Sequence, residues 1–298
     1  MSVLAHRQSI VVGVDGSEMS TKAALWAAAV ADRRSAPLHL AHALPNPGYH
    51  YSEAALLFQA EFTDAVRKSA EDILDRAEKR VAAQFPDLRV ARSTHPGPAG
   101  LALVGLSKQA DLVVVGYSGA GAVGSLLTGS TVLRVVNHAH CAVTVFKSEG
   151  EWAAPDHRPV VVGVDGSELS QMAIAEATEF ASLFDVQLLA VHGWGAGDYA
   201  GRQSALTMVN WAVVEEEQRV LMAENLAGWK DKYPDLGVTS IVEQENAARL
   251  MLRHAEDAQL IVVGSHGRNR LSGAILGSTS QNLLHNATCP VMICRHAD

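Results

Sequence analysis

Short apolar runs alternate with longer amphipathic stretches along the chain. SIVVGVD (9–15) and PLHLAHAL (37–44) have the length and composition of buried strands. The stretch between them, 17–35, predicts a helix, because Ser17 and the acidic Glu18 mark its start. Strands that alternate with helices indicate βαβ units and a parallel sheet, and right-handed crossovers then place helices on both faces of that sheet.

The same alternation continues through both halves of the chain. In the first half we expect a helix at 53–84, a strand at 88–93, a helix at 99–110, a strand at 111–116, a short helix from Ser130 and a strand at 142–147. In the second half we expect strands at 160–165 and 187–194, a helix near 204–233, a strand at 238–244, a helix at 246–257 and strands at 260–264 and 291–295. The predicted fold class is α/β, with two tandem doubly wound (Rossmann-like) domains that each contain a five-stranded parallel sheet.

The two halves are also repeats of each other. VVGVDGSE occurs at 11–18 and again at 161–168. GYSGAGAVGSLLTGST (116–131) aligns with GSHGRNRLSGAILGST (264–279) in the same order. A repeat of about 150 residues is too long for a solenoid and matches the size of one domain.

The duplication sets the expected domain boundaries. The first domain covers 1–147 and the second covers 160–298. Between them, SEGEWAAPDHRP (148–159) is polar and contains two prolines, so it reads as a linker.

Composition and charge narrow the function class. Hydrophobic residues make up 48% of the chain and charged residues 19%, which is typical of a globular protein with a full core. The net charge of −8, without a run of Lys or Arg, argues against nucleic acid as a partner. The three cysteines argue against a disulfide framework and favour a cytoplasmic location. We expect neither a signal peptide nor a membrane span.

An aspartate ends the first strand of each half. Asp15 and Asp165 fall where the ligand crevice of an open parallel sheet lies, beyond the carboxyl ends of the strands. A carboxylate there accepts hydrogen bonds from ribose hydroxyls or an adenine amine. The alternative is an Asp-Gly turn that begins the next helix. The sequence leaves both roles open, because a duplicated turn would also persist.

A glycine-rich loop follows the fourth strand of each half, with the pattern G-x-x-G, nine residues and G-S-T. Glycine lets backbone amides approach a ligand closely. Ser130–Thr131 and Ser278–Thr279 then open a helix, whose free N–H groups and dipole favour phosphate. A flexible loop with an ordinary helix cap is the alternative. The chain has no P-loop, dinucleotide-binding or kinase motif.

Together these motifs resemble those of the universal stress protein family, in a tandem form similar to that of actinobacteria. The family is marked by G-2x-G-9x-G-[S/T] after the fourth strand and by an Asp that closes the first, and the similarity covers almost the whole chain outside the linker. The resemblance implies ATP at two sites per chain, with Mg²⁺ as a companion ion. It also implies an adenine pocket at the end of the second strand, at Ala41–His42 and Val191–His192. Both histidines read as core residues whose backbone, rather than imidazole, touches adenine.

The residues expected around the nucleotides come from the strand ends, the helix start and the glycine loop of each half. In the first half they are Gly13, Val14, Asp15, Ser17, Ala41, His42, Gly116, Gly119, Gly129, Ser130 and Thr131. In the second half they are Gly163, Val164, Asp165, Ser167, Val191, His192, Gly264, Gly267, Arg268, Gly277, Ser278 and Thr279. We expect no metal-ligand set and no catalytic residue.

Little or no ATP hydrolysis is expected. The first glycine loop contains no Lys or Arg, whereas phosphoryl transfer needs cations against the developing charge, and one Arg is worth about 10³–10⁵ in rate. In the second loop, Arg268 and Arg270 are either phosphate contacts or solvated side chains. We therefore predict a nucleotide-dependent regulator of stress and growth that is at most a weak ATPase.

Two other functions stay open. In the first, the chain is an interaction or scaffold protein in which ATP is structural, and the last strands (142–147 and 291–295) pair the domains within the chain and then in a homodimer. In the second, the chain is an ATP-dependent enzyme, for which only Asp15 and Asp165 are candidate bases. The protein partner is unknown at this stage.

Overall fold

The structure is a computed structural model that describes residues 9–44, 59–117, 129–148, 154–195, 210–267 and 276–296, with only the backbone of 59–63. It divides the chain into two compact units, Met1–Pro155 and Asp156–His296, which we call unit 1 and unit 2.

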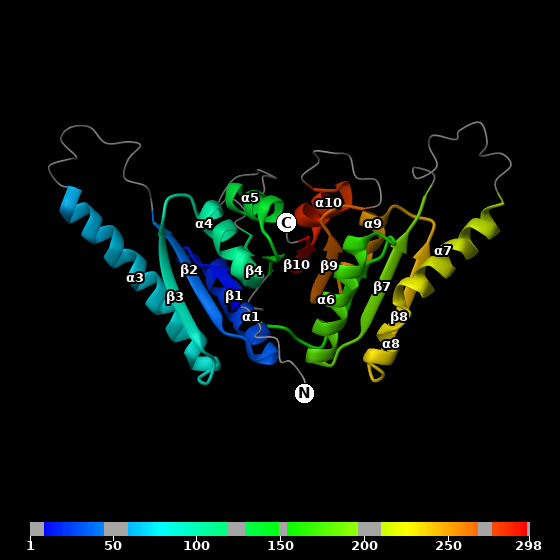
Figure 1. Cartoon of the computed structure of the whole chain (residues 1–298), viewed down its shortest axis with the longest axis horizontal. Helices are drawn as coiled ribbons and strands as arrows, with labels where there is room; N and C mark the ends of the chain where they lie inside the picture. The colour runs from blue at the N-terminus through cyan, green and yellow to red at the C-terminus, as the bar shows by residue number, and fades with distance from the viewer. Residues whose placement is uncertain are drawn as a thin grey trace. The chain divides into compact units, whose positions relative to one another are not determined.

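The described part of unit 1 contains a parallel sheet of five strands in the order β3-β2-β1-β4-β5. The strands are β1 (Ser9–Gly13), β2 (Leu38–Leu44), β3 (Val90–Pro96), β4 (Ala110–Gly116) and β5 (Ala142–Phe146). The α-helices, labelled in Figure 1, are α1 (Glu18–Arg34), α3 (Gln59–Gln84), α4 (Ala99–Leu106) and α5 (Ser130–His138). A short 3₁₀ helix, η2 (Ser107–Gln109), follows α4.

The described part of unit 2 repeats this plan, with the strand order β8-β7-β6-β9-β10. Its strands are β6 (Val160–Gly163), β7 (Leu188–Gly193), β8 (Val238–Glu243), β9 (Leu260–Gly264) and β10 (Val291–Cys294). Its helices are α6 (Glu168–Phe184), α7 (Trp211–Leu226), α8 (Trp229–Lys232), α9 (Ala247–Ala255) and α10 (Ser278–Asn286). The α/β fold predicted for each half is confirmed.

Two of the predicted helices differ in extent from the observed ones. The single helix expected near 204–233 is wrong, because α7 ends at Leu226 and the short α8 begins at Trp229. Gly228 separates them with a φ of 82°, a left-handed conformation that an α-helix does not contain. The helix expected at 99–110 ends at Leu106 and continues only as η2.

Helices cover both faces of the unit 1 sheet. A side chain at Gly13 would point at Leu103 of α4, whereas one at Gly116 would point at Met19 of α1. The register pairs Gly13 with Val115, so Gly116 faces the opposite side of the sheet. Helix α4 therefore lies on one face and α1 on the other, and α5 packs against α4 while α3 packs against α1.

Small residues let the helices approach the sheet closely. Helix α1 is buried over most of its length, and its buried positions are mainly alanines around Trp26. The interior strand β4 is buried from Leu112 to Val115. A parallel sheet covered on both faces needs such continuous apolar strands, which explains why valine-rich runs rather than alternating patterns mark the strands.

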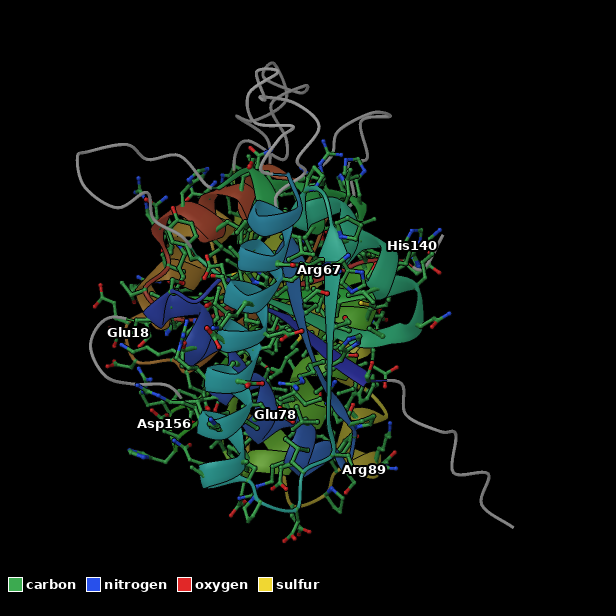
Figure 2. All side chains as sticks on the ribbon, turned by 90° about the vertical axis from the view of Figure 1, so that its left-hand side faces the viewer. Glu18, Arg67, Glu78, Arg89, His140 and Asp156 are labelled. Atoms are coloured by element: carbon green, nitrogen blue, oxygen red, sulfur yellow. The ribbon has the colours of Figure 1, made fainter. Side chains whose placement is uncertain are left out.

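Helix α3 is tied to the edge strand β3 by ion pairs. Arg92 of β3 binds the carboxylates of Asp75 and Glu78 on α3. Figure 2 shows α3 beside β3, with Glu78 labelled on the helix. These groups are about half exposed, so water screens the ion pairs and they contribute little to stability.

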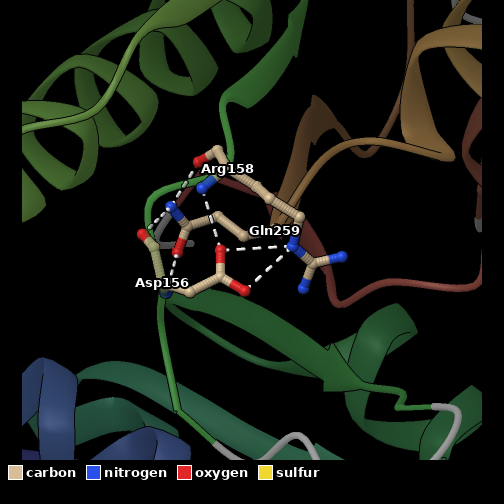
Figure 3. Close-up of polar contacts among 3 residues, drawn as sticks. All are labelled: Asp156, Arg158 and Gln259. Atoms are coloured by element: carbon tan, nitrogen blue, oxygen red, sulfur yellow. Dashed lines mark hydrogen bonds and ion pairs between the residues drawn. The ribbon is translucent and has the colours of Figure 1, made fainter.

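A buried glutamine anchors the segment that enters unit 2. Gln259 precedes β9 and is fully buried. Its Oε1 accepts a hydrogen bond from the Asp156 N–H at 3.0 Å, and its Nε2 donates to the carbonyl oxygens of Asp156 and Arg158 (Figure 3). Arg158 in turn forms an ion pair with Asp156 at 2.9 Å. Residues 156–158 of the predicted linker are therefore fixed to unit 2.

Within the residues that the structure describes, no helix combines the length and the apolar character needed to cross a membrane.

Candidate functional site

Each unit contains a cavity at the point where its strand order reverses. In unit 1, β1 lies between β2 and β4. The chain continues from β1 to β2 and β3 on one side, and then crosses to β4 and β5 on the other side. Such a switch point opens a crevice beyond the carboxyl ends of the strands. We name the cavities crevice 1, of about 330 Å³ in unit 1, and crevice 2, of about 280 Å³ in unit 2.

The residues singled out in the sequence gather around these crevices. Those that border crevice 1 are Gly13, Val14, Asp15, Ser17, Ala41, His42, Gly116, Gly129, Ser130 and Thr131. Those that border crevice 2 are Gly163, Val164, Asp165, Ser167, Val191, His192, Gly264, Gly267, Gly277, Ser278 and Thr279. Gly119, Arg268 and Arg270 lie outside the described residues. That the gathered residues bind a nucleotide stays a prediction.

The position of Asp15 is compatible with both roles weighed from the sequence. Its Oδ1 accepts a hydrogen bond from the Ser17 N–H at 2.9 Å, which makes the Asp-Gly turn. Ser17 then caps α1, because its Oγ accepts from the Ser20 N–H at 3.1 Å. The same carboxylate borders crevice 1. Turn formation and ligand binding are therefore compatible at this position.

The hydrogen bonds around Asp15 also set its charge. Burial raises the pKa of the carboxyl, but hydrogen bonds from Ser17 and Ser20 outweigh it, so the pKa lies below its usual value. Asp15 is thus a carboxylate at neutral pH and offers only acceptor oxygens to a ligand.

Asp165 repeats this arrangement in unit 2. Its Oδ1 accepts from the Ser167 N–H at 2.9 Å, and its N–H donates to Ser170 Oγ at 3.1 Å. Gly267 lies directly against the carboxylate, because a Cβ added to Gly267 would lie 2.7 Å from Asp165 Oδ2. A larger residue at this position would therefore displace the carboxylate from its place at the crevice.

The glycine loops lead into helix starts that face the crevices. Gly129 precedes α5 and Gly277 precedes α10, and neither helix has a side-chain cap. The first N–H groups of a helix have no partner within it. Because Ser130 and Ser278 occupy the first positions and border the crevices, these starts suit a phosphate or another anion.

The two matching histidines have different surroundings. His192 is 2% exposed, its Nδ1 lies 2.6 Å from the Val164 carbonyl oxygen, and its Nε2 lies 2.9 Å from Gln218 Oε1. The interpretation as a satisfied core histidine therefore holds for His192. His42 is less buried and keeps the first of these bonds, with Nδ1 donating to the Val14 carbonyl at 2.7 Å.

Sequence reasoning missed the wall of crevice 1 that comes from β3 and α4. His95, Ala99, Ala102 and Leu103 border the cavity, and none was singled out. The third strand was expected to end at residue 93, whereas β3 extends to Pro96 and carries His95 to the crevice. In crevice 2, Ala247 and Met251 occupy the positions that correspond to Ala99 and Leu103. His266 also borders crevice 2 and was not predicted from the sequence.

The crevices contain the kinds of group that a nucleotide site needs. Their volumes lie near the lower end of small-molecule cavities, which begin at about 300 Å³. Each crevice offers a carboxylate for hydroxyl or amino groups, a helix start for phosphates and glycines that admit close backbone contact. Among the described residues, no group of three or more His, Cys, Asp and Glu side chains is arranged to hold a metal ion.

Comparison with known proteins agrees with the duplicated fold. The sequence model of the Universal stress protein family matches residues 6–147 of this chain and again residues 157–295. Universal stress protein Rv2005c of Mycobacterium tuberculosis is 36% identical over 303 residues, covering 100% of both chains. Universal stress protein Rv1996 of the same species is 36% identical over 311 residues, covering 99% of this chain and 97% of its own.

A solved structure shows the same fold over the full length. The crystal structure of a universal stress protein from Archaeoglobus fulgidus has a TM-score of 0.69 and 18% identity, covering 98% of this chain and 97% of its own. At 18% identity, this similarity shows a shared fold and nothing further. The sequence matches, which cover both units, show that the chain belongs to the universal stress protein family and carries two family domains in tandem.

Proposed function

We propose that the chain binds ATP in both crevices and acts as a nucleotide-dependent regulator of stress and growth, with little or no hydrolysis. The observation that carries this proposal is the pairing, in each crevice, of a strand-end carboxylate with an uncapped helix start. These groups match a sugar hydroxyl or base amine at one end of a nucleotide and its phosphates at the other.

The geometry of the aspartates supports selective binding. In each unit, Oδ1 is held by the N–H of the serine two residues later, at 2.9 Å. A carboxylate fixed by its own turn loses little conformational freedom when a ligand binds, which favours affinity. Because both units keep this arrangement, two nucleotides per chain are expected.

The charge distribution supports slow turnover. The loop of residues 116–131 contains no Lys or Arg, and neither type of residue is among the described residues that border crevice 1. Phosphoryl transfer depends on such cations. Asp15 is also a poor general base, since its pKa lies below the usual value.

The experiment that tests the proposal counts nucleotide released from the purified full chain on denaturation, by chromatography and mass. Wild type is expected to release close to two ATP per chain. Gly267→Val, which displaces the Asp165 carboxylate, and Asp15→Ala are each expected to release about one. Gly105→Val is the matched control, because a side chain at this exposed helical glycine meets nothing within 4 Å.

The outcomes separate the candidate functions. Release of ADP in place of ATP would favour the ATP-dependent enzyme. A turnover of ATP above about 1 s⁻¹, the low end of the rates of typical enzymes, would contradict slow hydrolysis. If the purified chain contains no nucleotide and also takes up no added MgATP, the proposal of ATP binding is overturned. The interaction protein is then the first candidate. Domain pairing, a homodimer and a cytoplasmic location stay predictions.

A further inference from the structure

The two crevices differ in the wall that lies away from the phosphate end. Helix α5 connects β4 to β5, on the opposite side of β1 from β2 and β3. A nucleotide whose phosphates bind at the start of α5 therefore directs its base across β1, toward β2 and β3. At this end crevice 1 is bordered by residues of β2, β3 and α4, which we call the base-end wall: Ala43, His95, Ala99 and Ala102.

One helix position near this wall changes from small to large between the units. Ala102 of α4 is half-buried and borders crevice 1. Its match on α9 is Leu250, because Leu250 follows Ala247 by three residues, as Ala102 follows Ala99. Leu250 is fully buried and is not among the described residues that border crevice 2. The leucine side chain thus belongs to the packed interior of unit 2, whereas the alanine methyl of unit 1 leaves space at the crevice.

The backbone of unit 2 also lies closer at this end. Gly193 of β7 takes the place of Ala43 of β2. A Cβ added to Gly193 would lie 2.6 Å from the Ala247 Cα and 2.8 Å from the Glu245 carbonyl oxygen, which is too close for any side chain. The first turn of α9 therefore approaches β7 more closely than the first turn of α4 can approach β2, where Ala43 carries a Cβ.

The turn between strand and helix accounts for this difference. In unit 1 the Gly97 N–H donates to the Leu44 carbonyl oxygen at 3.0 Å, so pairing with β2 continues past the end of β3 before α4 begins. Gly97 has a φ of 91°, a left-handed conformation that favours glycine. In unit 2 the matching Glu245 N–H donates instead to the Glu243 carbonyl oxygen, at 2.9 Å. The chain therefore turns earlier in unit 2, which brings α9 against β7.

These differences leave crevice 1 larger than crevice 2, with volumes of about 330 Å³ and about 280 Å³. About 10–15 Å³ of cavity volume admits one water molecule, so a difference of this size admits a small chemical group. Three of the four residues of the base-end wall are alanines, so the group that suits it is apolar.

We propose that crevice 1 accepts a purine nucleoside triphosphate that carries a small apolar group on the six-membered ring of its base, whereas crevice 2 rejects it. This inference rests on the proposed binding of ATP and names the ligand class of each crevice. The ribose is attached to the five-membered ring of a purine, so the six-membered ring is the part that points away from the phosphates, toward the base-end wall. Ala102 leaves room for the added group, and Leu250 occupies that room in unit 2.

The test isolates one crevice at a time in the full chain. Gly267→Val leaves crevice 1 as the binding site, and Asp15→Ala leaves crevice 2. Each chain is titrated by calorimetry with the magnesium salts of ATP, N⁶-methyl-ATP and 2-methylthio-ATP, because the latter two carry a small group at either side of the six-membered ring. In the Gly267→Val chain at least one of the two is expected to bind within about threefold of ATP. In the Asp15→Ala chain both are expected to bind about tenfold or more weakly than ATP, since one surplus methylene in a closed pocket costs about 10–200-fold.

Exchange of the small and large residues tests the cause. Ala102→Leu, added to Gly267→Val, is expected to weaken binding of the accepted analogue by about tenfold and to leave ATP within about threefold. Leu250→Ala, added to Asp15→Ala, is expected to admit an analogue to crevice 2. If the loss of this buried side chain prevents folding, Ala102→Leu decides, because its position is half-buried. Gly105→Leu on the same helix is the matched control and is expected to change neither affinity, because a side chain there meets nothing within 4 Å.

The outcomes separate this inference from the proposed function. Rejection of both analogues by crevice 1, or equal acceptance by the two crevices, would overturn the inference while ATP binding stands. Loss of ATP itself in Ala102→Leu would also overturn it, because the residue would then contact the unsubstituted base. If neither crevice takes up ATP, the proposed function is wrong and the inference falls with it.

Discussion

Replacing Gln259 by leucine tests how strongly unit 2 depends on its buried glutamine. The side chain is fully buried and makes three hydrogen bonds to the backbone of Asp156 and Arg158 (Figure 3). Leucine has a similar volume but makes none of these bonds. The change therefore leaves one N–H and two carbonyl oxygens without their partner, at the segment that leads into β6.

The expected cost follows from these three bonds. A net contribution of about 1 kcal/mol each gives about 3 kcal/mol. Asp156 and Arg158 are partly exposed, so water replaces some of the lost bonds, and leucine gains some apolar burial. We therefore expect the free energy of unfolding of unit 2 to fall by about 2 kcal/mol. Gln259→Glu is expected to cost more, because its carboxylate would face two carbonyl oxygens in a buried position.

The assay reads the two units separately, because a chain of two units need not unfold in one step. Hydrogen exchange in increasing urea, analysed by mass spectrometry, gives an unfolding free energy for peptides of each unit. Gln187→Leu is the control, since its amide is exposed and, among the described residues, donates to the Thr239 hydroxyl rather than to buried backbone. A cost of Gln259→Leu within about 0.5 kcal/mol of the control, or an equal loss in unit 1, would refute the reasoning.

Two further predictions concern the strand–helix junctions. Ser170→Ala removes a buried hydroxyl that accepts a hydrogen bond from the Asp165 N–H. The free energy of unfolding of unit 2 is therefore expected to fall by about 1–2 kcal/mol, measured by the same exchange assay. An unchanged value would mean that water replaces the hydroxyl. The lowered pKa of Asp15 stabilises unit 1 above the unfolded-state value of about 3.9, and this contribution is lost as pH falls through the folded-state pKa. The stability gap between wild type and Asp15→Asn is therefore expected to shrink from about pH 5 to about pH 3, in urea titrations followed across that range; a constant gap would contradict the pKa direction.

The sequence predicts the scaffold well because its signals are local. Apolar runs bounded by turns mark the strands, and the serine after each Asp-Gly marks a helix cap, so Asp15 and Asp165 are placed correctly at the strand ends. The repeat shows each of these signals a second time, in the same order. One exception is the helix near 204–233, where the left-handed Gly228 ends one helix within a pattern that otherwise continues.

The features that distinguish the crevices are not local, which is why the sequence does not reveal them. His95 reaches crevice 1 only through the pairing of β3 with β2, over more than 50 residues of separation. The second bond of His192 depends on Gln218, which another helix brings to it. Gln259 appears in the sequence as an ordinary polar residue before a strand, and only the fold shows that it is buried. Strand register and helix packing decide these contacts, and neither is readable from a single window of sequence.

The duplication within one chain also fixes the ratio of the two crevices at one to one. Synthesis and degradation change the amount of both together, so neither crevice is gained or lost without the other. An imidazole borders crevice 1, whereas the matching position of unit 2 holds a glutamate that is paired with Arg253. Each chain therefore carries two chemically different versions of one crevice in fixed proportion, and a comparison of the two within one sample is independent of protein concentration.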